Sequence, residues 1–164
     1  MIAILDRRML TEDEAAVTSA ELKANGKRIV FTNGCFDFIH PGHVHILRKA
    51  LELGDVLFLG VNTDDSVSRL KGHDRPFLKL EARVQLLLEL RSVNFVVPFD
   101  EDTPLKLIER IIPDVLVKGG DYTPDSVVGA DFVKSHGGRV EIIPLMKGFS
   151  STAIIKALDR QNKQ

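Results

Sequence analysis

Residues 34–43 of this chain read GCFDFIHPGH, and this stretch decides how the rest of the sequence is interpreted. It directly follows an apolar run at 28–33, RIVFTN, which predicts a buried strand. Pro41 suits the first position of a helix, where its missing N–H costs nothing, and apolar residues recur at helical spacing over 44–51. The stretch is therefore predicted to be a strand-to-helix turn that carries both of its histidines at the start of the helix.

The same alternation of strand and helix continues along the chain. Thr11 and Glu14 form a predicted capping box at the start of a helix that ends at Gly26. A polar segment follows the second strand and runs through 70–76. Short apolar strands separated by helices predict an α/β fold, a Rossmann-like five-stranded parallel sheet with helices on both faces. The other strands are expected at 56–61, 95–97, 115–117 and 140–143, and the other helices at 81–90, 104–111, between the fourth and fifth strands, and over 150–158.

Length and composition narrow the classes of protein. The 164 residues suit one domain over 1–164, with 1–27 as an N-terminal helical extension packed on it and 161–164 frayed. Lys and Arg number 22 against 23 Asp and Glu, so the basic field of a nucleic-acid binder is missing. The single cysteine, Cys35, excludes an internal disulfide and fits a reducing compartment. No apolar run approaches the roughly 18 residues of a membrane span, so we expect a cytoplasmic protein with no membrane or nucleic-acid partner.

Polar, glycine-rich segments follow four of the five predicted strands, at 33–37, 62–64, 118–122 and 148–152. The carboxyl ends of parallel strands share one edge of the sheet, where ligands of this fold class bind. Two predicted helix N-termini would also point into this edge, and their free N–H groups favour phosphate. The phosphate-binding loops GxxxxGK[ST] and GxGxxG are absent from the sequence, so the histidine turn is expected to hold phosphate instead. Full positive charges could come from Lys71, Arg75, Arg83 and Lys118.

Two segments carry a family resemblance. Residues 34–43 are similar to the GxFDxxHxGH signature of the cytidylyltransferase-like nucleotidyltransferases, and 150–155, SSTAII, resemble that family's second signature, STTxI. Further segments resemble one branch of the family, the D-glycero-β-D-manno-heptose 1-phosphate adenylyltransferases. These are RLKG at 69–72, RP at 75–76, FDEDTP at 99–104, KGGDY at 118–122 and VGA at 128–130. The resemblance runs from about residue 21 to residue 158, and it implies the nucleotidyltransferase fold built around an HxGH motif.

The resemblance also implies an activity and its partners. Members of this branch transfer AMP from ATP to the sugar 1-phosphate by in-line attack without a covalent intermediate, which gives ADP-heptose and pyrophosphate. Mg²⁺ is expected mainly on the phosphates, with its protein ligands left unassigned. Many members carry a fused sugar kinase domain, whereas this chain resembles the stand-alone transferase and implies a separate heptose kinase in the same pathway. Ser151 stands where the family usually has Thr, and a homodimer is expected from the family and from a leucine-rich helix at 84–90 that is apolar on more than one face.

The residue types fit this chemistry because the attacking phosphate is already ionised and needs only positioning and charge stabilisation. Catalytic roles are predicted for His40, His43, Lys71 and Arg83. Nucleotide binding is predicted for Asn33, Gly34, Cys35, Phe36, Asp37, Gly42, Ser150, Ser151 and Thr152. The sugar-phosphate side is predicted to comprise Asn62, Asp64, Arg75, Lys118, Gly119, Asp121 and Tyr122.

Several alternatives stay open at this point. The same chemistry could use CTP with glycerol 3-phosphate or another sugar or polyol phosphate, because the base is not readable from the motifs. A silent nucleotide-binding module would be expected to have lost the HxGH pattern, and a class I aminoacyl-tRNA synthetase would need a basic patch and more chain. Cys35 with the two histidines could bind zinc only with a tighter set of ligands. Asp37 could staple the turn, Lys118 could be a solvated strand end, and 150–152 could be only a helix cap.

Overall fold

The computed structural model of the protein describes residues 6–120, 122–146 and 148. Five parallel strands form one sheet in the order β3-β2-β1-β4-β5. The chain therefore runs outward from β1 to one edge and then returns to the other side of β1, which places the reversal point between β1 and β4. The strands are β1 (Ile29–Gly34), β2 (Val56–Asn62), β3 (Phe95–Phe99), β4 (Val115–Gly119) and β5 (Arg139–Ile143).

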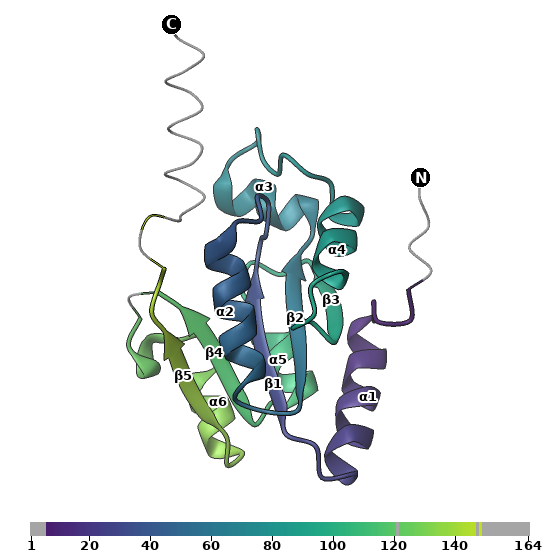
Figure 1. The fold of residues 1–164 in the computed structure, drawn as a ribbon, viewed down its shortest axis with the longest axis vertical. Helices are drawn as coiled ribbons and strands as arrows, with labels where there is room; N and C mark the ends of the chain where they lie inside the picture. Colours follow the sequence, from purple (N-terminus) through teal and green to yellow (C-terminus); the bar gives the residue numbers. More distant parts are fainter. Residues whose placement is uncertain (1–5, 121, 147, 149–164) are drawn as a thin grey trace, which may run out of the picture.

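Helices cover both faces of the sheet in three layers (Figure 1). One buried cluster joins α2 and α4 to one face, and a second joins α1, α5 and α6 to the other. In each cluster the strands contribute alternate residues, as expected for a sheet that is buried on both sides. The helices are α1 (Glu12–Ala24), α2 (Pro41–Leu51), α3 (Asp64–Lys71), α4 (Leu80–Leu88), α5 (Leu105–Ile111) and α6 (Ala130–Ser135), with a 3₁₀ turn, η1, at Pro124–Ser126.

The predicted α/β fold is confirmed, and the five strands lie where the sequence placed them to within a few residues. The N-terminal helix has the expected capping box between Thr11 and Glu14. It packs on the body of the fold, where the Ser19 hydroxyl donates to the carbonyl of Ile111 at 2.7 Å. Residues 1–5, the predicted final helix at 150–158 and the predicted frayed end at 161–164 lie outside the described residues.

One helix was not predicted. The polar segment after the second strand contains α3, whose N-cap Thr63 accepts a hydrogen bond from the Ser66 amide. Val67 is its one buried apolar residue, so the segment lacks the apolar periodicity that signals a helix. The capping residue followed by two aspartates in the first turn was the available signal.

The leucine-rich helix α4 differs from the expectation of an apolar surface on more than one face. Val84, Leu87 and Leu88 are buried against the sheet, and Leu86 is the only large apolar residue of this described helix that is exposed. This arrangement is that of an ordinary amphipathic helix. No helix in the described part of the chain is long and apolar enough to cross a membrane.

Candidate active site

A cavity of about 700 Å³ opens at the carboxyl edge of the sheet, where β1 and β4 diverge. It brings together most of the residues that the sequence placed in the site. Those that line it are Asn33, Gly34, Cys35, Phe36, Asp37, His40, Gly42, His43, Asn62, Lys71, Lys118, Gly119 and Tyr122. The strand-end argument therefore located the pocket correctly.

The histidine pair stands at the first turn of α2. His40 is the N-cap, and its Nδ1 accepts a hydrogen bond from the Gly42 amide at 3.1 Å. This bond leaves the proton of the neutral ring on Nε2. The ring of His43 stacks on that of His40, with centroids 3.9 Å apart and planes inclined by 27°. The two imidazoles are thus fixed side by side on the pocket wall at a helix N-terminus, where backbone N–H groups favour anions.

Both imidazoles are held in the neutral form. Burial lowers the pKa of His40. Burial, the neighbouring His40 ring and the charge of Lys71 together lower the pKa of His43 to about 4. His43 Nδ1 is buried without a hydrogen-bond partner among the described residues, so Nε2 is the nitrogen left to meet a ligand. At neutral pH the pair therefore offers hydrogen bonds and not full charges.

Two lysines supply the positive charge on the described part of the pocket lining. Lys71 comes from the exposed end of α3. Lys118 stands at the end of β4, where its ammonium donates to Asn33 Oδ1 at 3.2 Å and lies 5.9 Å from the centre of the Tyr122 ring. Burial lowers the pKa of Lys118. Lys118 is therefore not a solvated strand end, which was the alternative interpretation of this residue.

Asp37 fastens one pocket loop to another. Its side chain is 1% exposed and accepts hydrogen bonds from Arg75 Nε at 2.5 Å and from the amides of Phe77 and Leu78 at 2.6 and 3.2 Å. Arg75 also lies over the Phe77 ring, 4.4 Å from its centre. Arg75 does not line the pocket, so the structure places this predicted sugar-phosphate residue in a clasp behind it. The contacts of Asp37 thus agree with the alternative interpretation, in which this residue stabilises the turn.

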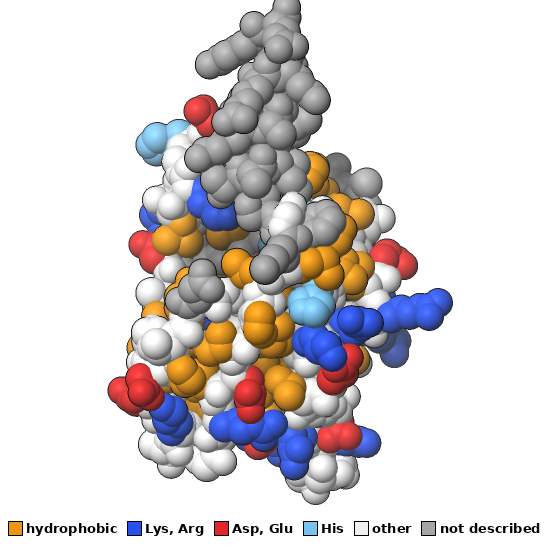
Figure 2. All heavy atoms as spheres, turned by 60° about the vertical axis from the view of Figure 1, so that its left-hand side comes forward, with side chains coloured by type: hydrophobic (Ala, Val, Ile, Leu, Met, Phe, Trp, Pro, Cys, Tyr) orange, Lys and Arg blue, Asp and Glu red, His pale blue; other side chains and the backbone are white. Residues whose placement is uncertain are grey.

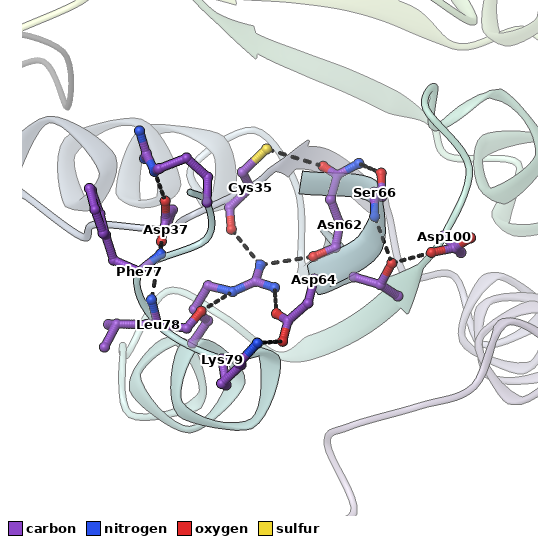
Figure 3. Close-up of polar contacts among 12 residues, drawn as sticks. Cys35, Asp37, Asn62, Asp64, Ser66, Phe77, Leu78, Lys79 and Asp100 are labelled. Atoms are coloured by element: carbon purple, nitrogen blue, oxygen red, sulfur yellow. Dashed lines mark hydrogen bonds and ion pairs between the residues drawn. The ribbon is translucent and has the colours of Figure 1, made fainter. Parts of the chain in front are cut away.

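Arg83 lies beneath the pocket and not on its surface, which departs from the catalytic contact predicted for it. The side chain has no exposed surface, and it donates to the carbonyls of Cys35, Asn62 and Leu78 at 2.6, 2.8 and 3.0 Å. Its Nη2 donates to Asp64 at 2.8 Å, and Lys79 also pairs with that carboxylate. Cys35, Asn62 and Asp64, which are labelled in Figure 3, bind this buried group from three segments of the chain. Asp64 is occupied by these cations and does not line the pocket either.

Asn62 and Cys35 form part of the pocket floor. Asn62 is 3% exposed and its amide donates to the Ser66 hydroxyl at 2.9 Å, while the Cys35 thiol faces Asn62 Oδ1 at 3.8 Å (Figure 3). The described residues contain no group of three or more His, Cys, Asp or Glu that could hold a metal. Cys35, His40 and His43 therefore do not form such a group. Asp121, Ser150, Ser151 and Thr152 were also predicted for the site and lie outside the described residues.

The sequence reasoning missed two parts of the pocket. Asp102, Thr103 and Pro104 line it after β3, the one strand of the sheet that the strand-end prediction leaves out. The same strand-end rule would have found them. The other missed part is a mostly apolar wall that combines α2, the end of α3, the region of η1 and the segment after β5. It comprises Ile46, Leu70, Ser126, Val127, Val128 and Leu145.

Figure 2 shows that hydrophobic side chains gather in the middle of the face formed by α2 and β5, with charged groups mostly at its lower end. Val128 and Leu145 are 43% and 50% exposed, and Tyr122 is similarly open. Gly119 brings α2 close to β4 here, because a Cβ at this position would lie 2.3 Å from Ile46 Cδ1. Any side chain at this position would force Ile46 to shift, whatever the ligand.

Comparisons with known proteins agree with this geometry. The chain is 56% identical to the Bifunctional protein HldE of Syntrophotalea carbinolica over 139 residues and to that of Geobacter metallireducens over 146 residues, which are 84% and 89% of this chain. The Coxiella burnetii protein of the same name is 47% identical over 92% of this chain. The chain spans only 28%, 30% and 32% of these three proteins, so it corresponds to less than a third of their length.

Two crystal structures share the fold. The lipopolysaccharide core biosynthesis protein of Thermoplasma volcanium has a TM-score of 0.58 and 27% identity, and the match covers 76% of this chain and 100% of that one. The pantoate-beta-alanine ligase of Francisella tularensis has a TM-score of 0.57 at 15% identity over 92% of this chain and 77% of its own, which is evidence of the fold alone. A family model described as cytidylyltransferase-like matches residues 31–157. Because this match covers most of the chain, the protein belongs to the cytidylyltransferase-like family.

Proposed function

We propose that this protein is an adenylyltransferase that transfers AMP from ATP to D-glycero-β-D-manno-heptose 1-phosphate, giving ADP-heptose and pyrophosphate. The observation that carries the nucleotidyl-transfer chemistry is the stacked pair His40 and His43 at the N-terminus of α2 in the main pocket. The sugar substrate is supported by the heptose-branch resemblance, by the similarity to the HldE proteins and by a structural relative named for lipopolysaccharide core biosynthesis.

The reaction needs no residue that forms a covalent bond. An oxygen of the acceptor phosphate attacks the α-phosphorus of ATP, and the bond from that phosphorus to the bridging oxygen breaks. Pyrophosphate leaves with the electron pair, and no proton has to be removed because the attacking oxygen is already ionised. The protein therefore acts by positioning both substrates and stabilising the negative charge that builds up on the phosphates.

The neutral histidines suit this role. His40 presents its Nε2–H and His43 its Nε2 without either ring carrying a charge, beside the free backbone N–H groups of the first turn of α2. Lys71 adds a full positive charge on the same pocket lining, close enough to His43 to contribute to the lowered pKa of that ring. Losing one such donor typically lowers the rate by about 10²–10³-fold.

Mg²⁺ would arrive as part of the substrate, bound to the phosphates of ATP. The described residues offer it no cage of acidic or histidine ligands, and Mg²⁺ commonly keeps several waters when phosphates bind it. A homodimer, a separate kinase that supplies the heptose phosphate and a cytoplasmic location complete the proposal. These three parts rest on the family resemblance and on the composition of the chain.

The test is to incubate the protein with each of four nucleoside triphosphates and a panel of sugar and polyol phosphates, and to follow pyrophosphate release. ATP with the heptose 1-phosphate should give the highest kcat/KM. Preference for CTP with glycerol 3-phosphate would replace the proposal by the alternative cytidylyltransferase. No release with any pair would leave a nucleotide-binding module without this activity and would overturn the proposal.

A further inference from the structure

Lys118 is a mostly buried cation without a carboxylate partner in the described part of the chain. No ion pair there includes it. Its polar contacts are one neutral oxygen, Asn33 Oδ1, and the face of the Tyr122 ring. By contrast, the fully buried Arg83 beneath the same pocket has three carbonyls and a carboxylate around it.

An unpaired buried ammonium is costly to the folded protein, because desolvation disfavours the charged form. The lowered pKa of Lys118 expresses this cost. Yet the group lines the main cavity at the point where β1 and β4 diverge, which is where ligands bind in this fold class. A cation held in this way in a binding pocket fits an anionic group of the ligand as its missing partner.

The pocket has a second, separate positive region. Lys71 ends α3, which follows β2, whereas Lys118 belongs to β4, so the two lysines reach the pocket from strands on opposite sides of β1. The histidine pair, Lys71 and the N-terminus of α2 form the region suited to the triphosphate of the nucleotide. Lys118 lies beside the Tyr122 ring and an apolar wall that includes Val127 and Val128, a surface suited to the face of a sugar ring.

We propose that Lys118 binds the phosphate of the acceptor, with Asn33 orienting its ammonium, and thereby selects a phosphorylated acceptor over a neutral hydroxyl compound. This inference rests on the proposed nucleotidyl transfer and deepens it by naming the residue that recognises the second substrate. The ion pair also places the attacking group: the phosphate held by Lys118 is the one whose oxygen bonds to the α-phosphorus while pyrophosphate departs with the electron pair.

The kinetic test compares Lys118→Met, Lys118→Arg and the matched control Lys49→Met, which removes a lysine paired with Glu52 on the outer surface of α2. Lys118→Met should raise the KM for the sugar phosphate by about 10–100-fold, the range of one charge-assisted hydrogen bond, and change the KM for ATP by less than about threefold. The KM of Lys118→Arg for the sugar phosphate should lie between those of the wild type and Lys118→Met, because a guanidinium keeps the charge but not the shape of an ammonium. Both KM values of Lys49→Met should match those of the wild type. An equal or larger effect of Lys118→Met on ATP would overturn the assignment.

Thermal unfolding without ATP provides a second readout that does not depend on turnover. The ligand-free Lys118→Met protein should melt at or above the wild-type temperature, because it lacks a mostly buried charge that no carboxylate among the described residues pairs with. Adding the sugar phosphate, or inorganic phosphate as a minimal probe, should raise the melting temperature of the wild type and not of the variant. If the ligand-free variant melts several degrees lower, the charge is satisfied within the protein, by Asp121 or another group, and the inference fails.

The two proposals can fail separately. One outcome is that no acceptor supports pyrophosphate release, while inorganic phosphate stabilises the wild type but not Lys118→Met. The proposed reaction is then wrong and the phosphate site stands. If the wild type turns over the heptose phosphate and Lys118→Met does so with unchanged constants, the reaction stands and the role of Lys118 is wrong.

Discussion

Arg83 and Asp64 form an ion pair of 2.8 Å in which the arginine side chain is completely buried and the carboxylate is about a quarter exposed. The same guanidinium binds the carbonyls of Cys35 and Asn62, so it connects the ends of β1 and β2 to the start of α3. These are the segments that carry one side of the pocket. Arg83 therefore fixes the ends of β1 and β2 and the start of α3 relative to one another beneath the pocket.

This position predicts that Arg83 matters first for stability. Arg83→Met should lower the free energy of unfolding by about 3–5 kcal/mol, because three carbonyls and a carboxylate lose a buried charged partner. Chemical denaturation of Arg83→Met, Arg83→Lys, Asp64→Asn and the double variant would measure the coupling. An Arg83→Lys protein that kept wild-type stability but lost about 10²-fold in turnover would instead restore the catalytic contact predicted from sequence.

His43 should be needed for turnover and not for folding. His43→Ala removes one member of the stacked pair, so kcat should fall by about 10²-fold or more, while the free energy of unfolding should stay within about 1 kcal/mol of the wild-type value. His45, two residues along the same helix, does not line the pocket, and His45→Ala is the matched control. Pyrophosphate release under saturating substrates checks the prediction. Wild-type turnover in His43→Ala would refute the assignment, and a variant that does not fold would favour a structural role.

The low pKa of His43 predicts a dependence of stability on pH. In the folded protein this pKa is about 4, against an ordinary value of 6.5, so between these two pH values the unfolded chain binds a proton that the folded protein does not. The contribution is fully present above pH 6.5 and is lost as the pH falls toward 4. It is worth about 2 kcal/mol after allowance for partial exposure of the ring. Denaturant unfolding across this range should show a steeper loss for the wild type than for His43→Gln. Parallel curves would contradict the prediction.

Asp37 should control the loop that contains Arg75 and Phe77. Asp37→Asn removes the charge that Arg75 and two backbone amides share, so the loop should open more often. Hydrogen exchange at the amides of Phe77 and Leu78 should become at least about tenfold faster. Asp74→Asn, in the same loop, is the control, since no hydrogen bond or ion pair of the Asp74 side chain is found in the described structure. Unchanged exchange at both amides would show that the clasp does not hold the loop.

The expected homodimer is open to a direct measurement. Sedimentation at micromolar concentration should show a species of about twice the 18.2 kDa chain. The helix α4 no longer supports this expectation, because Leu86 is its only exposed large apolar residue. The near-zero net charge and the family resemblance remain as its support. A single species of chain mass, with and without ATP and Mg²⁺, would contradict the prediction.

The local pattern of the sequence was enough to predict the alternation of strand and helix, the capping box at Thr11 and the turn that carries His40 and His43. Each of these depends on residues within one or two turns of one another: apolar runs, a proline at a helix start, and a threonine that caps a helix. The edge of the sheet that holds the site was also predictable, because the carboxyl ends of parallel strands coincide whatever the strand order. The α3 helix was not predicted because few of its residues are buried, so its sequence lacks apolar residues at helical spacing.

The tertiary structure decided which polar side chains face the cavity. The sequence alone does not distinguish the roles of four cationic residues, each of which follows or precedes a predicted element near the same edge: Lys71, Arg75, Arg83 and Lys118. Their environments differ because residues distant in the sequence meet them: Asp37 meets Arg75 across 38 positions, and the carbonyl of Cys35 meets Arg83 across 48. Those contacts hold Arg75 and Arg83 away from the cavity, whereas Lys71 and Lys118 line its wall. The sequence by itself determined the turn, the fold class and the edge of the sheet where the cavity lies. The division between buried structural charges and charges on the cavity wall came only from packing, because it depends on long-range partners that no local pattern specifies.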